Sequence, residues 1–449
     1  MTYTTRRIIF YTFAVLFLIA APALILFTEG FRFNLQTGRL ERLGVLVIKS
    51  KPEEATITLS NKISEEKTPA SIKLPADDYP ITVSKEGYSS WTKLLPVRSR
   101  YTTFIEDVLL FKNTEPKQII NDSIIGSAFS SDLRYILTAN KNNEIAIYDI
   151  ARNSNTVLEK IENAKEITKL SFSPDNSSAT INYTTTLGLK ILHSWALGSG
   201  EPTLSSANIS NLGFDELVLA KTSGTFSGVK NNFLYTLNIF TNRLDKITKS
   251  KSPFYFRGTN VWSIDNETSL PFVLYSQPGN LNNEPQAILS LPQDKYSFGE
   301  IESPYLLLQA KNSKRIFLID PQEPTTPVLD IQGTRSAFRH NRDGELELLS
   351  WDDFEIWRGN AARNTTELLW RQSNPLLGVA WHPLGEYIFF ATKNEIYALE
   401  LDNRDTKNIT TLFSQENVSI TDFAIDPTGK KIYFSVAGES GAGVYEREL

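Results

Sequence analysis

Residues 379–401 read VAWHPLGEYIFFATKNEIYALEL. A short apolar run is followed by a tight polar turn, a second apolar run, another turn and a third run rich in apolar residues. Short runs of β-branched and aromatic residues separated by turn residues are typical of antiparallel strands joined by hairpins. We therefore predict a β-meander over this stretch.

The same pattern recurs from about residue 116 to the C-terminus. Clear copies lie at 128–150, 170–183 and 423–436, and weaker copies at 303–320 and 338–357. The estimated repeat starts are 126, 167, 210, 258, 298, 335, 377 and 420. Their spacing is near the roughly 40–45 residues that one four-stranded propeller blade requires.

These repeats resemble the WD40-like and TolB-like β-propeller repeats, in which a Phe-Ser-Pro-Asp-Gly-like turn joins the first two strands of a blade. The resemblance implies a β-propeller domain over residues 116–449, with eight blades favoured and seven as the alternative. The final repeat lacks an obvious fourth strand. PKQIIND at 116–122 is the segment expected to supply it, which would close the ring and leave no free edge.

A second β-rich region covers residues 44–112. Its short alternating runs are separated by Pro52, Pro69, Pro75 and Gly87. In the run EATITLS the apolar residues Ala55, Ile57 and Leu59 fall on one face. Period-two alternation of this kind predicts half-buried strands, and a small β-sandwich is the expected fold.

The order of motifs in this region is a strand, Pro52-Glu53-Glu54-Ala55, Thr68-Pro69, Gly87-Tyr88 and Trp91. This order resembles the PEGA domain. Glu54 stands where the family has its turn glycine, and Asp77-Asp78 replaces the usual glycine before the tyrosine strand. A glutamate adopts positive φ less readily than glycine. The resemblance implies a spacer or interaction module without catalytic residues.

Residues 8–27 form an uncharged apolar run near the N-terminus. At about 1.5 Å per residue it spans roughly 30 Å, the thickness of a bilayer core. A cleaved signal peptide is the alternative, but its apolar core is normally about 7–15 residues long. Arg6 and Arg7 favour a cytoplasmic tail at residues 1–7. We expect a single-pass anchor, a linker at 28–43 and an extracytoplasmic remainder.

Composition narrows the functional classes. The chain of 449 residues has a net charge of −5 and no cysteine. The net negative charge argues against nucleic-acid binding. The absence of cysteine excludes disulfides and thiol chemistry. The three histidines, His193, His340 and His382, are expected in different blades. No catalytic, cofactor or metal motif is present, so we predict no catalytic residue, cofactor or metal site.

Two short segments resemble functional motifs. Ser90 and Lys93 have the spacing of a Ser-Lys nucleophile pair, but no companion motif follows, and we interpret the match as coincidence. The acidic run Asp402-Asn403-Arg404-Asp405 lacks the alternating acidic spacing and the glycine of a calcium loop. We interpret it as a solvated hairpin tip.

The leading hypothesis is a membrane-anchored scaffold protein of the cell envelope. Its propeller would bind another envelope protein or a cell-wall glycan through loops at one face. The alternative is a propeller hydrolase or lyase acting on envelope polymers, which would need histidines and carboxylates to converge in the channel. The sequence alone names no ligand-binding residue.

Overall fold

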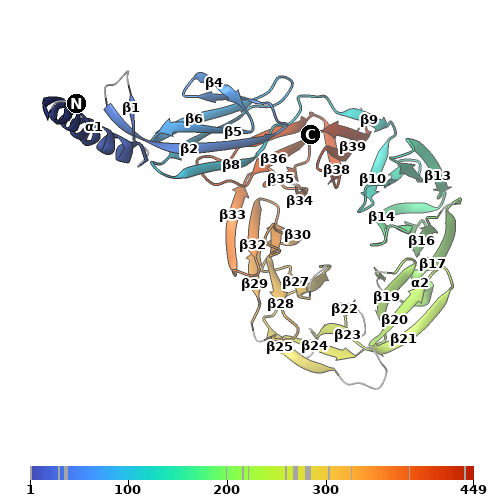
Figure 1. The fold of residues 1–449 in the computed structure, drawn as a ribbon. Helices are drawn as coiled ribbons and strands as arrows, with labels where there is room; N and C mark the ends of the chain where they lie inside the picture. The colour runs from blue at the N-terminus through green and yellow to red at the C-terminus, as the bar shows by residue number, and fades with distance from the viewer. Residues whose placement is uncertain are drawn as a thin grey trace. The chain divides into compact units, whose positions relative to one another are not determined.

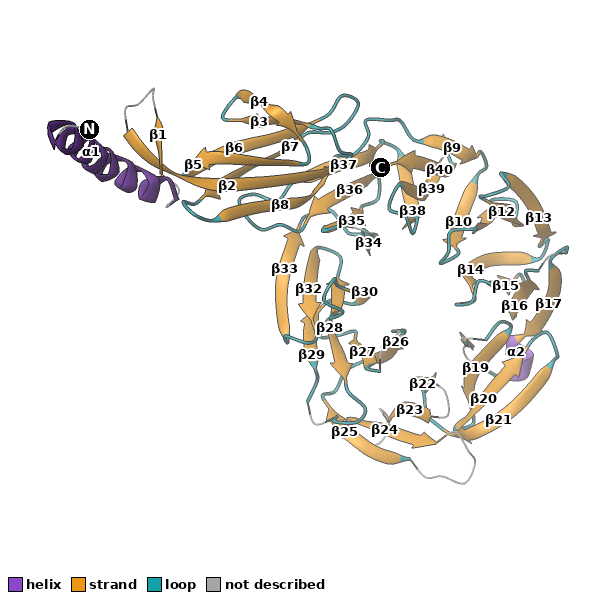
Figure 2. Ribbon diagram, viewed as in Figure 1, coloured by secondary structure: helices purple, strands orange, loops and turns teal. Residues whose placement is uncertain are grey.

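The chain folds as two units, each described here by itself. The computed structural model describes residues 3–28, 31–34, 39–198, 200–214, 217–220, 222–257, 260–265, 272–278, 285–301, 304–324, 326–383, 385–438 and 441–449. Unit 1 consists of Met1–Thr114, Glu400–Thr410 and Leu449, and unit 2 of Glu115–Leu399 and Thr411–Glu448. Apart from the helix α1 and the single-turn helix α2, the regular elements are β-strands (Figures 1 and 2).

The N-terminal helix α1 covers Tyr3–Thr28 and contains the run predicted at 8–27. None of its residues is buried, and its length and apolarity suffice to cross a membrane. The hydroxyls of Thr12 and Thr28 donate to the carbonyls of Ile8 and Ile25 within the helix, as an apolar surrounding requires. A signal sequence has the same length and composition.

Unit 1 contains two four-stranded sheets. One has the order β1-β2-β5 with β8 paired to β2, and the other has the order β4-β3-β6-β7. The strands are β1 (Phe31–Asn34), β2 (Arg39–Lys51), β3 (Thr56–Leu59), β4 (Lys62–Lys67), β5 (Ala70–Pro75), β6 (Asp77–Ser84), β7 (Trp91–Val97) and β8 (Thr102–Leu109). Residues 28–43, expected as a linker, include β1 and the start of β2, while residues 29–30 and 35–38 lie outside the described part.

A single hydrophobic core joins the two sheets of unit 1. It combines Leu46 and Ile105 of the first sheet with Ile57 and Leu95 of the second. The expected alternation is present, because Ala55 and Ile57 are fully buried and Leu59 packs against the same core. The arrangement is therefore the predicted β-sandwich.

The turn before β3 places Glu54 at a φ of 60°, in the left-handed region. Its backbone N–H donates to the carbonyl of Thr68 at 2.8 Å, and this bond holds the turn in that conformation. The geometry that glycine would supply is thus present in this chain, adopted by a glutamate at a cost of roughly 1–2 kcal/mol.

Replacing Glu54 by glycine is expected to raise the free energy of unfolding by about 0.5–1 kcal/mol. The relief of the left-handed strain exceeds the roughly 0.4–1 kcal/mol of extra unfolded-state entropy that glycine brings. Glu53 has no positive φ, so Glu53→Gly is the matched control and should destabilise. Urea titrations of the three proteins measure both effects. Equal destabilisation by the two substitutions would contradict the argument.

The described residues of unit 2 form eight four-stranded antiparallel sheets that follow one another around a ring (Figure 1). The first four contain β10 (Ile124–Phe129), β11 (Tyr135–Asn140), β12 (Glu144–Asp149), β13 (Ser154–Lys160); β14 (Ala164–Phe172), β15 (Ser178–Thr185), β16 (Lys190–Ala196), β17 (Thr203–Asn208); β18 (Val218–Leu219), β19 (Thr225–Lys230), β20 (Phe233–Asn238), β21 (Arg243–Lys249); and β22 (Phe254–Arg257), β23 (Asn260–Asp265), β24 (Phe272–Pro278), β25 (Gln286–Leu291).

The other four contain β26 (Tyr296–Gly299), β27 (Leu306–Ala310), β28 (Arg315–Ile319), β29 (Leu329–Gln332); β30 (Arg335–His340), β31 (Leu346–Trp351), β32 (Glu355–Asn360), β33 (Thr365–Arg371); β34 (Gly378–Trp381), β35 (Tyr387–Ala391), β36 (Glu395–Glu400), β37 (Ile409–Ser414); and β38 (Val418–Ile425), β39 (Lys431–Gly438), β40 (Gly443–Glu448) with β9 (Lys117–Ile120). This is the predicted propeller arrangement, and the blade number inferred from repeat spacing stays a prediction.

Consecutive sheets of unit 2 share hydrophobic cores. Ile145 of β12 and Trp195 of β16 belong to one core, and Ile316 of β28 and Leu348 of β31 belong to another. Each sheet therefore buries apolar side chains against its neighbours, which is how a ring of twisted sheets excludes water.

The ring closes through β9, as the sequence predicted. β9 pairs with β40 in antiparallel register, with Ile120 opposite Val444. Gln118 adds a side-chain bond from Nε2 to the carbonyl of Ala442 at 2.8 Å. Gly443 has a φ of 147°, and a Cβ there would overlap the carbonyl oxygen of Ile120. Glycine is required at this close approach.

One predicted repeat start is wrong. Position 210 falls in the short helix α2 (Ile209–Leu212), and the first strand of that sheet begins at Val218. The side chain of Asn208 accepts from the N–H of Asn211, and Gly213 ends the helix with a φ of 73°. These are the usual start and stop signals of a helix, so local capping overrides the repeat spacing here. The start predicted at 258 lies outside the described residues.

Candidate functional site

A pocket of about 850 Å3 lies in unit 2 along the first strands of several sheets. We call it the channel pocket. Strands β18, β19, β22, β26 and β30 and the turn after β19 supply most of its described lining. The lining includes Val218, Leu219, Ser227, Val229, Lys230, Asn231, Asn232, Lys251, Phe254, Tyr255, Phe256, Ser297, Phe298, Glu300, Ile301, Lys311 and Phe338. Its volume is in the range of pockets that bind ligands.

Aromatic side chains form much of the channel pocket. β22 carries Phe254, Tyr255 and Phe256 in succession, and all three line the pocket while only partly buried. Tyr255 stacks on Phe298 with ring centroids 5.8 Å apart, and Trp262 lies behind it at 6.1 Å. Stacked rings backed by a buried tryptophan provide a rigid apolar surface.

The charges on the lining are mostly positive. The described lining residues include three lysines, Lys230, Lys251 and Lys311, and one carboxylate, Glu300. Lys251 pairs with Asp265 at 2.9 Å, and Lys230 donates to the carbonyl of Leu212 at 2.7 Å. Lys311 is exposed in the turn after β27, and within the described residues its ammonium has no carboxylate partner.

Ser227 lines the channel pocket with only 4% of its surface exposed. Its hydroxyl oxygen is buried, and among the described residues it has no hydrogen-bond partner. A buried polar atom without a partner costs about 1–3 kcal/mol. Because this oxygen is shielded from solvent, it offers no ready contact to a ligand.

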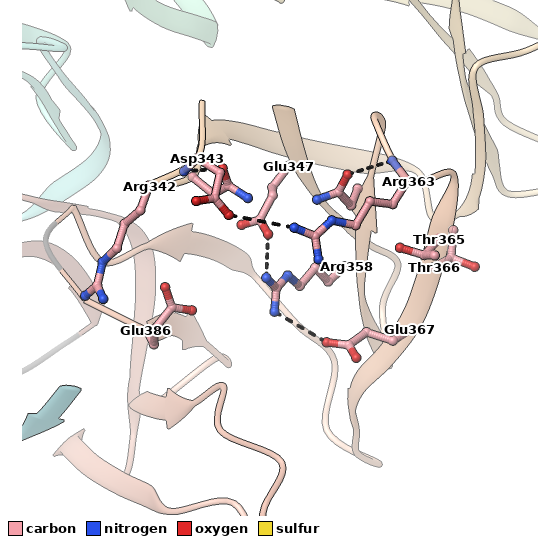
Figure 3. Close-up of a pocket in the computed structure, with 11 residues that line it drawn as sticks. Arg342, Asp343, Glu347, Arg358, Arg363, Thr365, Thr366, Glu367 and Glu386 are labelled. Atoms are coloured by element: carbon pink, nitrogen blue, oxygen red, sulfur yellow. Dashed lines mark hydrogen bonds and ion pairs between the residues drawn. The ribbon is translucent and has the colours of Figure 1, made fainter. Parts of the chain in front are cut away.

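A second pocket, of about 520 Å3, lies beside β31, β32 and β33 and is strongly charged (Figure 3). We call it the arginine pocket. Glu347, only 1% exposed, is held between Arg358 and Arg339, the latter at 2.9 Å. Arg339 also lies 3.8 Å from the centre of the Trp381 ring. Figure 3 shows Glu347 and Glu367 both reaching Arg358.

The charges of the arginine pocket are matched internally. Arg363 pairs with Glu345 at 3.0 Å and with Asp343 at 3.7 Å. Hydrogen bonds from Asn360, Arg363 and Asn341 lower the pKa of Glu345. Arginines that are already paired in this way have little left to offer an anion. We therefore interpret this pocket as a structural ion network and the channel pocket as the better candidate for ligand binding.

The residues of the PEGA-like motif lie in unit 1, and the structure brings two groups of them together. Ala55 donates its N–H to the hydroxyl of Thr68 at 3.0 Å, and that hydroxyl also lies 2.6 Å from that of Ser50. The turn Pro52, Glu53, Glu54, Ala55 therefore meets Thr68 and Pro69.

The second group is Gly87, Tyr88 and Trp91. Gly87 has a φ of 80° and accepts from the N–H of Asn113. Tyr88 packs on the core, and Trp91 is buried with its indole N–H donating to Glu400 at 3.0 Å. In both groups the contacts hold the fold of unit 1, and they form no pocket.

The interpretation of residues 402–405 as a solvated hairpin tip holds for residues 403–405, which are exposed in the connection between β36 and β37, whereas Asp402 is partly buried. This segment belongs to unit 1, where Asp402 lies 3.4 Å from the buried ammonium of Lys93 and Asp405 accepts from the N–H of Leu94. Sequence reasoning missed this cluster. A signal was present, because Lys93 shares the inward face of β7 with Trp91, and a buried lysine needs an acidic partner.

The three histidines lie on separate elements. His193 of β16 contacts Glu159 at 2.8 Å and Tyr183 at 3.1 Å, His382 contacts the carbonyl of Gly429, and His340 is exposed at the end of β30. Within the part of the chain that the structure describes, no group of three metal-ligating side chains is present. Ser90 is exposed, whereas Lys93 is engaged by Glu400 and Asp402.

Comparison with known proteins finds one matching family model and several similar solved structures. Residues 43–110 match the family model for the PEGA domain, which confirms the resemblance read from the motif order. The chain is similar to the crystal structure of Saccharomyces cerevisiae Sqt1, with 11% identity, a TM-score of 0.48, and coverage of 74% of this chain and 98% of that one.

It is also similar to the β-propeller domain of Cps50 (Swd1) from Myceliophteria thermophila, with 14% identity and a TM-score of 0.43. That similarity covers 75% of this chain and 98% of that one. The comparison with curated proteins finds no match.

Proposed function

We propose that this protein is a membrane-anchored scaffold of the cell envelope whose propeller binds another protein. The channel pocket is the observation that carries the proposal, because its described residues offer a half-buried aromatic surface and an excess of positive charge in one place. Apolar surface of this kind is typical of sites that bind other molecules. In this proposal α1 is the anchor and the PEGA-like region is a spacer.

Protein is favoured over a cell-wall glycan as the ligand. Aliphatic side chains such as Val218, Leu219 and Val229 line the channel pocket next to the aromatic rings. They cannot hydrogen-bond to sugar hydroxyls but can bury apolar side chains of a partner. For the hydrolase or lyase alternative, no described residues provide a supporting observation, because the three histidines do not converge.

The proposal is tested by site-specific photo-crosslinking in native membranes. The tagged full-length protein carries a photoreactive residue at Ser297, which lines the channel pocket, or at Lys169, exposed on β14 and outside it. We expect the Ser297 position to capture one protein that the Lys169 position does not. The membranes are washed with carbonate beforehand, and release of the protein in that wash would contradict the anchor.

Truncation of one pocket aromatic should abolish the capture. Phe256→Ala is expected to lower recovery of the partner at least about tenfold, because buried aromatic anchors contribute most of the affinity at interfaces. Phe354→Ala is the matched control, since Phe354 is 42% exposed in a turn outside the channel pocket, and it should leave recovery unchanged. Equal capture by both variants would place the binding surface elsewhere.

A further inference from the structure

We propose that the channel pocket binds an extended acidic peptide segment that carries aromatic or aliphatic side chains. This inference rests on the proposed function and names the chemistry of the partner. Three properties of the pocket carry it: its apolar rings, its lysines and the amides of Asn231 and Asn232.

The apolar rings select for apolar side chains. Phe254, Phe256 and Phe298 come from two neighbouring first strands and are partly exposed toward the pocket. Side chains of a partner that bury against them gain about 25 cal/mol for each Å2 removed from water. A ligand made only of phosphates would leave this surface wet.

The lysines set the sign of the ligand's charge. Lys311 carries no ion pair among the described residues, and Lys230 uses one of the three donors of its ammonium on a carbonyl oxygen. Lys251 is already neutralised by Asp265. Among the described lining residues Glu300 is the only one with a carboxylate, so these residues attract an acidic segment and repel a basic one.

Two amide side chains match a peptide backbone. An extended segment carries one N–H and one C=O for nearly every residue, and these need partners when they leave water. Asn231 and Asn232 line the pocket, and each amide can donate to a carbonyl and accept from an N–H. The pocket can therefore contact both the side chains and the backbone of a bound peptide.

The test uses the purified full-length protein in detergent and a displayed library of random peptides about twelve residues long, which span at most about 40 Å when extended. We expect enriched peptides to be acidic and to contain aromatic or aliphatic residues. Lys311→Glu should weaken binding of an enriched peptide at least about tenfold, equivalent to 1.4 kcal/mol.

Lys141→Glu is the matched control. Lys141 is exposed and follows β11 as Lys311 follows β27, and the backbone N–H of each donates to a carbonyl at 3.0 Å. Because Lys141 does not line the channel pocket, its reversal should change peptide affinity less than twofold.

Three outcomes overturn the inference: enrichment of basic or uncharged peptides, no enrichment, or equal effects of the two reversals. Tighter binding of oligogalacturonate, an anionic glycan, than of any peptide would also overturn it. If no acidic peptide is enriched while the photoreactive residue at Ser297 still captures a protein, the inference of an acidic ligand is wrong and the proposed function stands. If that crosslinker captures nothing, the proposed function itself fails.

Discussion

Replacement of Lys93 by alanine is expected to lower the free energy of unfolding of unit 1 by about 3–5 kcal/mol. The Lys93 side chain is fully buried, with its ammonium 3.2 Å from Glu400 and 3.4 Å from Asp402, and it donates to the carbonyl of Asp402 at 2.7 Å. Removing the cation leaves the carboxylate of Glu400, itself only 5% exposed, without its charge partner. The cost of that buried charge dominates the effect.

Two further variants isolate the cause. Lys49 forms an exposed pair with Glu106 in the same unit at 2.7 Å, so Lys49→Ala should cost less than about 1 kcal/mol. Combining Lys93→Met with Glu400→Gln removes both charges and should restore much of the lost stability. Hydrogen exchange of the β7 amides in increasing urea reports on unit 1. If Lys93→Ala lowers the free energy of unfolding as little as Lys49→Ala does, the carboxylate of Glu400 is hydrated and the argument from a buried charge fails.

Replacement of Asp422 by asparagine is expected to stabilise the protein above neutral pH by about 2–3 kcal/mol. Burial raises the pKa of Asp422 to about 6, against an ordinary value of 3.8, and among the described residues its carboxyl accepts a hydrogen bond only from the N–H of Phe423. The neighbouring strands β10 and β34 carry no charged residue, and the one cation on β39, Lys431, pairs with Glu446. Each unit by which the pKa is raised corresponds to roughly 1.4 kcal/mol, so ionisation of Asp422 lowers the free energy of unfolding by about 2–3 kcal/mol.

The pH dependence has a definite sign. A carboxyl with a raised folded pKa contributes its stability below the unfolded pKa, near 4, and loses it as the pH rises through about 6. Asp422→Asn should therefore match the parent protein near pH 4 and exceed its stability at pH 8. Urea titrations across this range measure the difference.

Asp294 provides a control because the pKa of its carboxyl is shifted in the opposite direction to that of Asp422. Burial alone would raise its pKa, but hydrogen bonds from Ser313, Asn312 and Lys295 outweigh it and lower the pKa. Asp294→Asn should therefore destabilise the protein at neutral pH, with a deficit that shrinks as the pH falls. A parallel response of the two asparagine variants would falsify the distinction between these carboxyls.

Sequence patterns were sufficient for the features that depend on local periodicity. The alternation around Ile57 predicted a half-buried strand, and the missing final strand of the last repeat predicted the pairing of 116–122 with β40. Both follow from the period of a strand and from the cost of an unpaired edge. Such rules need no knowledge of distant neighbours.

Features that depend on distant neighbours escaped sequence analysis. Glu400 and Asp402 lie about 300 residues beyond Lys93, and no local pattern links them. The channel pocket likewise combines Ser227, Phe254 and Lys311 from three sheets. Its ring-shaped scaffold was predictable, but which side chains meet inside it depends on the packing of those sheets.

Closure of the ring by β9 also has a consequence for biosynthesis. A ribosome makes Ile120 long before Val444, so β9 must wait for its partner while the intervening sheets are made. During that interval the nascent propeller has one open side, and contacts of such high sequence separation form slowly. Premature termination before β40 would leave β9 unpaired, so incomplete chains should be recognised by chaperones and proteases while finished ones are not.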